Sequence, residues 1–252
     1  MSKIDLTDVK KKFDEEGYVF LPGFLSASEV TDVQDYLDKF IQNEVPNLSS
    51  DQAFYEDNND PSSLKQLFNL HQHEPFFAKL LLGSRFEEVA ELALDEKVIG
   101  KNVEYFNKPP LIGKPTPPHQ DNYYFMLQPP QAITMWLGLE DVDTENGCVR
   151  YIPQSHLQGL RAHGRTQTLG FSQGISDYDE KDKAKEVYFI TKPGDLLIHH
   201  SMTIHRADGN SSAVRGRKAL GFIYFGESAQ EDLERKKLYQ QKLQEERLIA
   251  GK

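Results

Sequence analysis

The chain has 252 residues and a mass of 28.8 kDa, a length that suits one large barrel or sandwich domain or two small domains. With 38% hydrophobic and 27% charged residues it can bury a sizeable core, which excludes wholesale disorder. Its formal net charge of −10 argues against broad electrostatic binding to nucleic acid or to an anionic membrane, and its single cysteine excludes an internal disulfide, multi-cysteine zinc sites and iron–sulfur clusters.

The sequence also bears on the cellular compartment. No apolar run approaches the ~20 residues that are needed to span a bilayer. Residues 1–17 mix Lys, Asp and Glu with single apolar residues, which is unlike a signal peptide. With Cys148 as the lone thiol, we expect a soluble cytoplasmic protein in a reducing compartment.

The first 95 residues are predicted to form a mostly helical N-terminal region. Apolar residues recur there at helical spacing, and serines stand where a helix cap is expected. The predicted elements are a helix over residues 5–16, a short strand with a turn over 18–24, a helix from Ser26 or Ser28 to about Asn43, a polar loop over 47–61, and helical stretches over 62–94 broken near Pro75 and Gly83.

The character of the chain changes over residues 96–226. Short β-rich runs separated by Pro, Gly and Asp, with no helices between them, are typical of a sandwich or barrel, including jelly rolls. The predicted strands are Val98–Phe106, Ala132–Leu139, Cys148–Ile152, Glu186–Thr191, Leu196–Ile198 and Lys218–Phe225. Residues 159–186 are predicted to form a long polar loop, and residues 227–252 a polar, helix-prone C-terminal tail.

Two separated segments carry residues that suit metal chemistry. In an extended backbone, His119 and Asp121 would point the same way and aim an imidazole and a carboxylate at one place. The later segment His199–His205 contains three histidines, one of which could complete a set of two histidines and one carboxylate. That set leaves coordination positions open and is the signature of non-haem Fe(II) oxygenases.

A basic pair follows this histidine segment. Arg215 and Arg217 precede the apolar run that begins at Ala219, and the planar fork of a buried arginine can bind both oxygens of a carboxylate. Both arginines have the same strand parity, so alternation alone does not choose between them.

These features together resemble the phytanoyl-CoA dioxygenase family of Fe(II)- and 2-oxoglutarate-dependent oxygenases. The resemblance covers roughly residues 102–225, and Gly17-Tyr18-Val19 looks like the opening of the family. The motifs that carry it are Phe106–Pro110, His119-Gln120-Asp121 with Tyr124-Phe125, Met135-Trp136, Asn146-Gly147-Cys148, Ile152–His156, Gly194-Asp195 ahead of His205, and Arg217–Leu220.

The resemblance implies a fold and a ligand set. The expected fold is mainly β, a double-stranded β-helix (a cupin-like jelly roll) decorated by N-terminal helices. By position, His119, Asp121 and His205 would bind Fe(II), and these three are the expected catalytic residues. Arg217 would anchor 2-oxoglutarate and Trp136 would flank it. His200 falls where the family often has another pocket residue, although a core histidine with satisfied hydrogen bonds is the favoured interpretation. His199 is expected to point away from the pocket.

One departure from the family affects the co-substrate site. The family usually has a Gly-Ser pair after the distal histidine, but Arg206-Ala207 stands here, so a hydroxyl contact to the co-substrate is missing. Thr134 or Thr203 is a candidate to replace it.

The resemblance further implies the activity: a dioxygenase that uses O₂ and 2-oxoglutarate to hydroxylate an unactivated C–H bond of a small polar metabolite, releasing succinate and CO₂. Oxidative demethylation or C–N or C–P cleavage through a hydroxylated intermediate is an alternative, and a catalytically silent jelly-roll binding module is another. The substrate is expected to be anionic or zwitterionic. The candidate substrate residues are Glu104, Asn122, Tyr123, Arg161 and His163.

Overall fold

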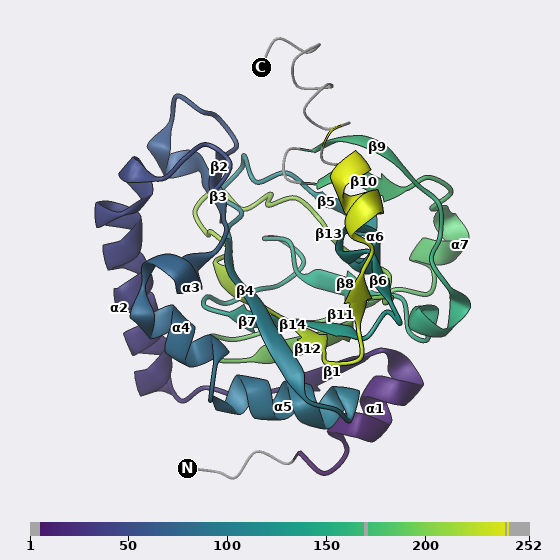
Figure 1. Cartoon of the computed structure of the whole chain (residues 1–252). Helices are drawn as coiled ribbons and strands as arrows, with labels where there is room; N and C mark the ends of the chain where they lie inside the picture. Colours follow the sequence, from purple (N-terminus) through teal and green to yellow (C-terminus); the bar gives the residue numbers. More distant parts are fainter. Residues whose placement is uncertain (1–5, 169–170, 240, 242–252) are drawn as a thin grey trace.

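The computed structural model describes residues 6–168, 171–239 and 241, and its body consists of two antiparallel sheets (Figure 1). The larger sheet has seven strands in the order β1-β12-β7-β14-β4-β3-β2. Its strands are β1 (Tyr18–Leu21), β2 (Ala53–Tyr55), β3 (Leu64–Leu67), β4 (Val98–Phe106), β7 (Ala132–Gly138), β12 (Leu196–His200) and β14 (Ala219–Gly226).

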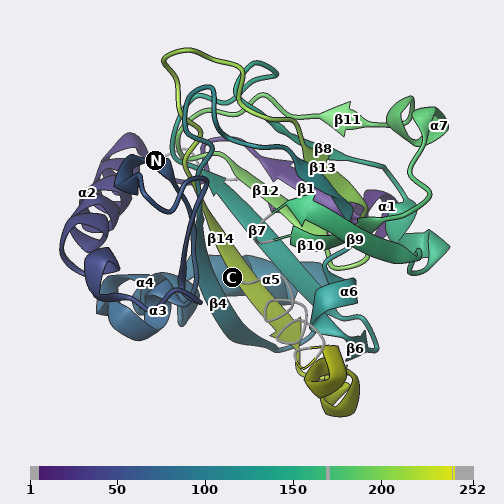
Figure 2. The same cartoon turned by 90° about the horizontal axis from the view of Figure 1, so that it is seen from above.

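The smaller sheet lies across from the larger one (Figure 2). Its order is β11-β8-β13-β5, formed by β5 (Thr116–His119), β8 (Val149–Tyr151), β11 (Val187–Tyr188) and β13 (His205–Ala207). Two short pairs complete the strands: β6 (Leu127–Gln128) with β15 (Gln230–Glu231), and β9 (His163–Thr168) with β10 (Phe171–Ile175). The two facing sheets form the jelly roll that the sequence predicts.

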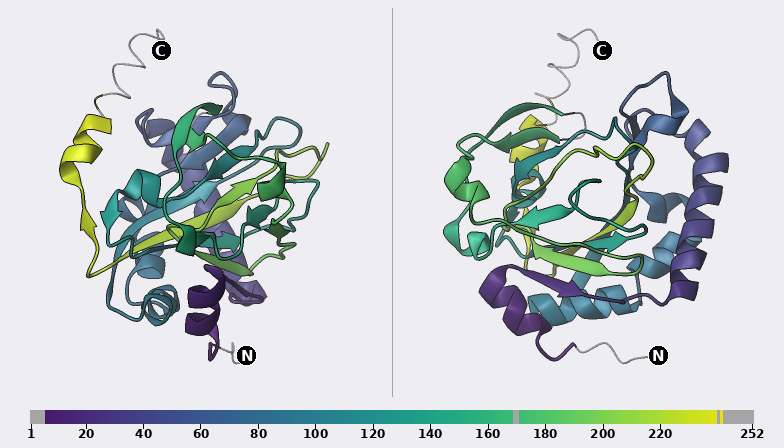
Figure 3. Two further views of the ribbon diagram at one scale, coloured as in Figure 1. Left: turned by 90° about the vertical axis from the view of Figure 1, so that its right-hand side faces the viewer. Right: turned by 180° about the vertical axis from the view of Figure 1, so that it is seen from behind.

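Helices cover the outer face of the large sheet. Helix α5 contacts β4, β7 and β14, and α3 and α4 contact β4. In Figures 1 and 3 these helices stand on the side of the large sheet that faces away from the small sheet. The helices are α1 (Val9–Glu16), α2 (Ala27–Asn43), α3 (Leu70–His73), α4 (Pro75–Leu81), α5 (Arg85–Leu94), α6 (Asn122–Phe125) and α7 (Glu180–Lys183).

The end of α1 is bonded to the turn between β12 and β13. Gly17 caps α1 in the left-handed region, with φ 83°. Its carbonyl accepts hydrogen bonds from the His200 amide (2.9 Å) and from the Thr203 hydroxyl (2.7 Å). A Cβ at Gly17 would overlap the side chains of Thr203 and His156. Glycine is therefore required here both by its backbone conformation and by this close packing.

The fold class agrees with the sequence prediction, but three local predictions were wrong. Residues 53–55 and 64–67, predicted as loop and helix, are the strands β2 and β3. These strands pair with each other, and β3 also pairs with β4, so the pairing overrides local propensity. The predicted polar loop over 159–186 instead contains the β9–β10 pair and α7.

The C-terminal segment packs on the body as far as the structure describes it. Strand β15 pairs with β6, and residues 233–239 are helical. The ring of Tyr239 lies against those of Tyr123 (6.4 Å between centroids) and Tyr124 (6.5 Å). The remainder of the predicted tail, residues 240 and 242–252, lies outside the described residues. Within the described part of the chain, no helix is both long enough and apolar enough to cross a membrane.

Candidate metal centre

A cavity of about 240 Å³ opens between the two sheets. Its walls include His119 and His205 from the small sheet, and Thr134, Trp136 and His199 from the large sheet. Apolar and aromatic side chains contribute most of the remaining wall. Such a concave, mainly apolar site with a few convergent polar groups is typical of a small-molecule pocket.

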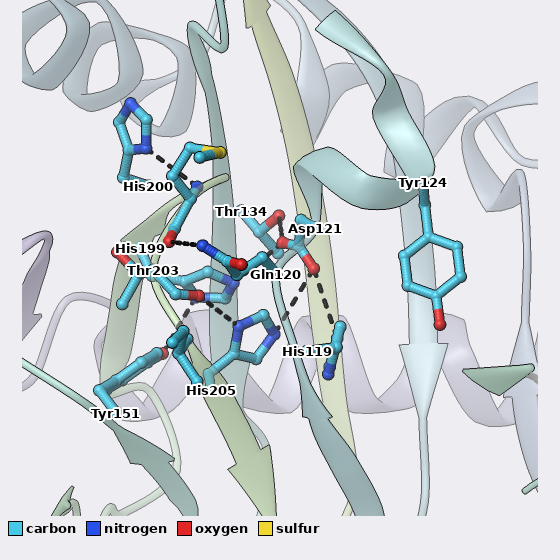
Figure 4. Close-up of polar contacts among 12 residues, drawn as sticks. His119, Gln120, Asp121, Tyr124, Thr134, Tyr151, His199, His200, Thr203 and His205 are labelled. Carbon is cyan, nitrogen blue, oxygen red and sulfur yellow. Dashed lines mark hydrogen bonds and ion pairs between the residues drawn. The ribbon is translucent and has the colours of Figure 1, made fainter. Parts of the chain in front are cut away.

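Three side chains at one wall of the cavity can grip a metal ion (Figure 4). The ligand atoms of His119, Asp121 and His205 all lie within 4.8 Å of one another. His119 and His205 are directly opposite each other in the β5–β13 pair. Asp121 Oδ1 lies 3.4 Å from Nε2 of His119 and 3.5 Å from Nε2 of His205. Two histidines and one carboxylate on one side leave further coordination positions open, as in non-haem iron oxygenases.

Hydrogen bonds fix the tautomer of both histidines. Nδ1 of His119 bonds the Pro117 carbonyl (2.8 Å), and Nδ1 of His205 bonds the Thr203 carbonyl (3.0 Å). Because a carbonyl only accepts, Nδ1 carries the proton in each ring, and the lone pair of Nε2 is left for a metal. Burial, followed by the nearby histidines 119 and 199, lowers the pKa of His205 well below its usual value, which keeps the ring neutral.

The carboxylate of Asp121 is held by two donors on its other oxygen. Oδ2 accepts hydrogen bonds from the Thr134 hydroxyl (2.6 Å) and from His199 Nε2 (3.1 Å). Burial would raise the pKa of Asp121, but the surrounding histidines, among them the hydrogen-bond donor His199, hold it well below its ordinary value. Asp121 is therefore a carboxylate whose Oδ1 faces the two imidazoles.

His199, not His200, is the additional histidine of the pocket. His199 Nδ1 accepts a hydrogen bond from the buried Tyr151 hydroxyl (3.0 Å), which leaves Nε2–H to donate to Asp121. Burial raises the pKa of Tyr151, so this hydroxyl stays protonated. His200 points away from this cluster (Figure 4). Its ring lies against those of Phe13 and His156. The expectation that His199 points away from the pocket was wrong: in β12 it pairs with Thr134 of β7, and both side chains line the cavity.

Arg217 is a buried cation without a counterion among the described residues. It is 4% exposed, its Nε lacks a hydrogen-bond partner, and its guanidinium lies 5.4 Å from the centroid of the Trp136 ring. Burial lowers its pKa to about 10, so it is still charged at neutral pH. Arg206 also lines the cavity but pairs with Glu186 and Asp208. A buried unpaired charge is costly, and an anion bound in the cavity would compensate it.

Arg215 is used elsewhere. Its guanidinium lies near the surface and pairs with Asp143 (2.8 Å) and with Glu145. The geometry thus separates the two arginines that strand parity alone could not distinguish.

Neither candidate threonine offers a spare hydroxyl hydrogen to a co-substrate. The Thr203 hydroxyl is fully buried and donates to the Gly17 carbonyl. Thr134 lines the cavity, but its hydroxyl donates to Asp121. Ala207, two residues after His205, lines the cavity without a polar side chain.

Glu104 is the one predicted substrate residue among the described residues that line the cavity. Its carboxylate accepts hydrogen bonds from Asn102 (2.8 Å) and Gln66 (3.4 Å). Burial, with a contribution from Asp121, raises the pKa of Glu104 to about 8.

The other four predicted substrate residues hold the structure around the cavity instead. Asn122 bonds the backbone of Leu127, and the ring of Tyr123 stacks on His163 at 4.2 Å. His163 Nε2 accepts from the Gln120 amide, between the two ligands of the H-x-D motif. Arg161 pairs with Asp177 and Asp182, each at 2.8 Å. The neighbours Tyr124 and Phe125 line the cavity in their place.

The open triad and the unpaired arginine share one cavity, and they fit a metal ion together with a carboxylate-bearing co-substrate. This combination defines the class of non-haem iron and 2-oxoglutarate-dependent dioxygenases. Residues 13–219 match the family model of phytanoyl-CoA dioxygenase (PhyH), and the chain belongs to this family.

Individual relatives agree with this membership. The chain is 29% identical to "Phytanoyl-CoA dioxygenase 1" of Oryza sativa subsp. japonica, over 85% of this chain and 87% of the relative. It is 26% identical to "Phytanoyl-CoA dioxygenase, peroxisomal" of Mus musculus, over 87% of this chain and 68% of the relative.

Solved structures share the fold. EvdO2 from Micromonospora carbonacea var. aurantiaca matches with a TM-score of 0.74 and 22% identity, over 91% of this chain and 94% of that one. The epimerase SnoN, solved with Fe3+, alpha ketoglutarate and nogalamycin RO, matches with a TM-score of 0.72 and 22% identity, over 89% of this chain and 84% of that one.

Proposed function

We propose that this dioxygenase hydroxylates an unactivated C–H bond of a small polar molecule, with His119, Asp121 and His205 as iron ligands and Arg217 as the anchor of 2-oxoglutarate. One observation carries the proposal: the buried, unpaired guanidinium of Arg217 shares a cavity with the open ligand triad. Iron and 2-oxoglutarate, when bound, supply the oxidative chemistry, in which O₂ converts the substrate C–H to C–OH and 2-oxoglutarate to succinate and CO₂.

The protein contributes orientation and exclusion of water. Arg217 would bind the far carboxylate of 2-oxoglutarate through its planar fork, with Trp136 packed beside it. Thr134 and His199 hold Asp121 so that one oxygen faces the metal position. The aromatic side chains of Phe106, Trp136 and Tyr151 keep this part of the cavity dry, which strengthens each polar contact.

The size and charge of the cavity narrow the substrate. A volume of about 240 Å³ is small for a ligand pocket, and 2-oxoglutarate must share it. Arg161 and His163 do not line it, so the anionic clamp predicted from them lacks support. We therefore favour a zwitterionic over a purely anionic substrate, and a small molecule over a long acyl chain.

Succinate release provides the test. The purified protein with Fe(II), 2-oxoglutarate and a library of small polar metabolites should release succinate when a substrate is present, and His119→Ala should reduce release to background. A protein that binds metal and 2-oxoglutarate but releases no succinate with any metabolite would favour the binding-module alternative. Mass analysis of the product distinguishes simple hydroxylation from demethylation or C–N or C–P cleavage.

The cytoplasmic location also stays a proposal, because several relatives are named as peroxisomal. It is supported by the single, buried cysteine, which suits a reducing compartment. Fractionation of cells that express the tagged protein tests it, and enrichment in an organelle fraction would contradict it.

A further inference from the structure

A second set of polar side chains on the cavity wall has incomplete hydrogen bonding. It carries an acidic group, whereas Arg217 is basic. Glu104 on β4 and Gln66 on β3 are 7% and 3% exposed, and both line the cavity. Glu104 stands beside Gly221 of β14 in the sheet register, and Gly221 in turn stands beside Trp136. The pair therefore belongs to the same inner face of the large sheet as the proposed co-substrate site.

Glu104 and Gln66 keep hydrogen-bond acceptors that have no donor. The carboxylate of Glu104 receives one hydrogen bond from Asn102 and a long one from Gln66, although a carboxylate can accept about four. Gln66 uses its NH₂ group for this contact, and its carbonyl oxygen Oε1 is buried without a partner. The two side chains thus present unsatisfied acceptors in a place that is closed to bulk water, an arrangement that is costly unless a donor completes it.

The described residues do not supply a cation to Glu104. No ion pair to Glu104 occurs within 4 Å among them, and Lys65, next to Gln66 in sequence, pairs with Glu56 at 3.5 Å. The charged group that acts most on Glu104 is Asp121, itself an anion, and the raised pKa of Glu104 reflects burial together with this repulsion. On its own, Glu104 is therefore mostly protonated at neutral pH, and a cationic ligand would favour the ionised carboxylate by offsetting the burial and the repulsion.

We infer that Glu104 and Gln66 recognise a protonated primary or secondary amino group of the substrate, which makes the substrate of the proposed dioxygenase a small amine or amino acid. The ligand must carry an N–H donor as well as a positive charge, because the buried acceptor Gln66 Oε1 lacks a hydrogen-bond donor. A quaternary ammonium would match the charge and leave that oxygen unsatisfied. This inference rests on the proposed function for the reaction that follows binding, and not for the binding itself.

The experiment measures binding without turnover. The protein is loaded with Zn(II), which has no redox chemistry, and with 2-oxoglutarate. It is then titrated calorimetrically at about pH 8.5, where Glu104 is mostly ionised and an alkylammonium is still protonated, with pentylammonium, pentyltrimethylammonium, 1-pentanol and pentanoate. The chain has one tryptophan, Trp136, which lines the cavity, so its fluorescence reports whether a probe binds there.

The wild-type protein should bind pentylammonium at least about tenfold more tightly than the other three probes, since a charge-assisted hydrogen bond is roughly twice as strong as a neutral one. Glu104→Gln should weaken pentylammonium binding by about tenfold or more and change 2-oxoglutarate binding less than twofold. The matched control Glu91→Gln removes the same charge from a carboxylate that pairs with Lys97, and it should bind as the wild type does.

Several results would overturn the inference: a wild-type protein that prefers pentanol or pentanoate, pentylammonium binding that is unchanged in Glu104→Gln, or a selective loss of 2-oxoglutarate binding in that variant. The probe series on the wild type decides the matter even if the variant does not fold. If 2-oxoglutarate fails to bind the wild type while pentylammonium binds through Glu104, the proposed function fails and the amine site stands.

Discussion

The part of the cavity wall around Asp121, called here the metal-binding wall, and the part formed by Arg217, Glu104 and Gln66 differ in how their polar groups are satisfied. At the metal-binding wall, Nδ1 of His119 and His205, Oδ2 of Asp121 and both nitrogens of His199 have hydrogen-bond partners within the protein. At the second wall, Arg217 Nε and Gln66 Oε1 are buried without hydrogen-bond partners. The first wall is preorganised by the fold alone, whereas the second would have its bonds completed by the proposed ligands.

Removing the charge of Arg217 should have the largest effect, because it acts on one wall and leaves the metal-binding wall intact. We expect Arg217→Gln to raise the KM for 2-oxoglutarate by roughly 100-fold, because two charge-assisted hydrogen bonds to a carboxylate are lost, and to leave metal affinity nearly unchanged. Initial rates of succinate formation and calorimetric metal titration check both quantities. Arg215→Gln is the matched control, and an equal effect from it would mean that the wrong arginine has been assigned.

The acidic group of the same wall should impose a pH dependence on stability. The pKa of Glu104 is raised from 4.5 to about 8 in the folded protein. Since the folded state then holds a proton that the unfolded state has lost, stability contributed by this group is full below pH 4.5 and falls as pH rises toward 8. Between pH 5 and pH 8, Glu104→Gln should remove a loss of stability of roughly 3 kcal/mol. Urea unfolding of the metal-free protein at pH 5 and pH 8 gives the free energy of unfolding at each pH. An equal change between the two pH values in wild type and Glu104→Gln would refute the prediction.

On the metal-binding wall, the support of Asp121 can be weakened without touching a ligand. His199→Leu removes one of the two donors to Asp121 Oδ2 and should lower metal affinity by about 10-fold, the lower end of the range for residues that orient metal ligands. Tyr151→Phe acts one bond further away and should cost less. Competition with a metal-binding dye measures both affinities. Unchanged affinity in His199→Leu would show that Thr134 alone orients the carboxylate.

The smallest effect on activity and stability is expected from a substitution of a residue that does not line the cavity. Arg161→Ala removes partly exposed ion pairs to Asp177 and Asp182, which should lower the free energy of unfolding by less than about 1 kcal/mol. The KM values for 2-oxoglutarate and for an identified substrate should stay the same. A tenfold rise in substrate KM would restore the role as an anion clamp that the sequence suggested.

The sequence predicted best what depends on short-range patterns. The inner strands from Val98 to Phe225 follow apolar runs, and the Ser26 cap of α2 is a local hydrogen bond. Strands β2 and β3 were missed because their pairing with β4 is long-range and their segments carry no strand pattern of their own.

The site shows the same limit. Resemblance placed the triad at positions that the fold brings together, although Asp121 has a helical backbone (φ −59°) and not the extended one assumed for His119 and Asp121. His199 was misjudged because the face that β12 turns to the cavity is set by its pairing with β7, which the sequence alone does not show. The role of Arg161 could not be seen because its acidic partners are defined only by the folding of residues 159–186.

The hydrogen bonds to Gly17 have a practical consequence for N-terminal truncation of this protein. The turn that delivers His205 to the metal position is hydrogen-bonded to the glycine that caps the first helix, almost two hundred positions earlier in the chain. A shortened version that starts at the first strand would keep every metal ligand and still lose the anchor of one of them. The opening segment therefore belongs to the smallest catalytic unit, and expression designs should retain it.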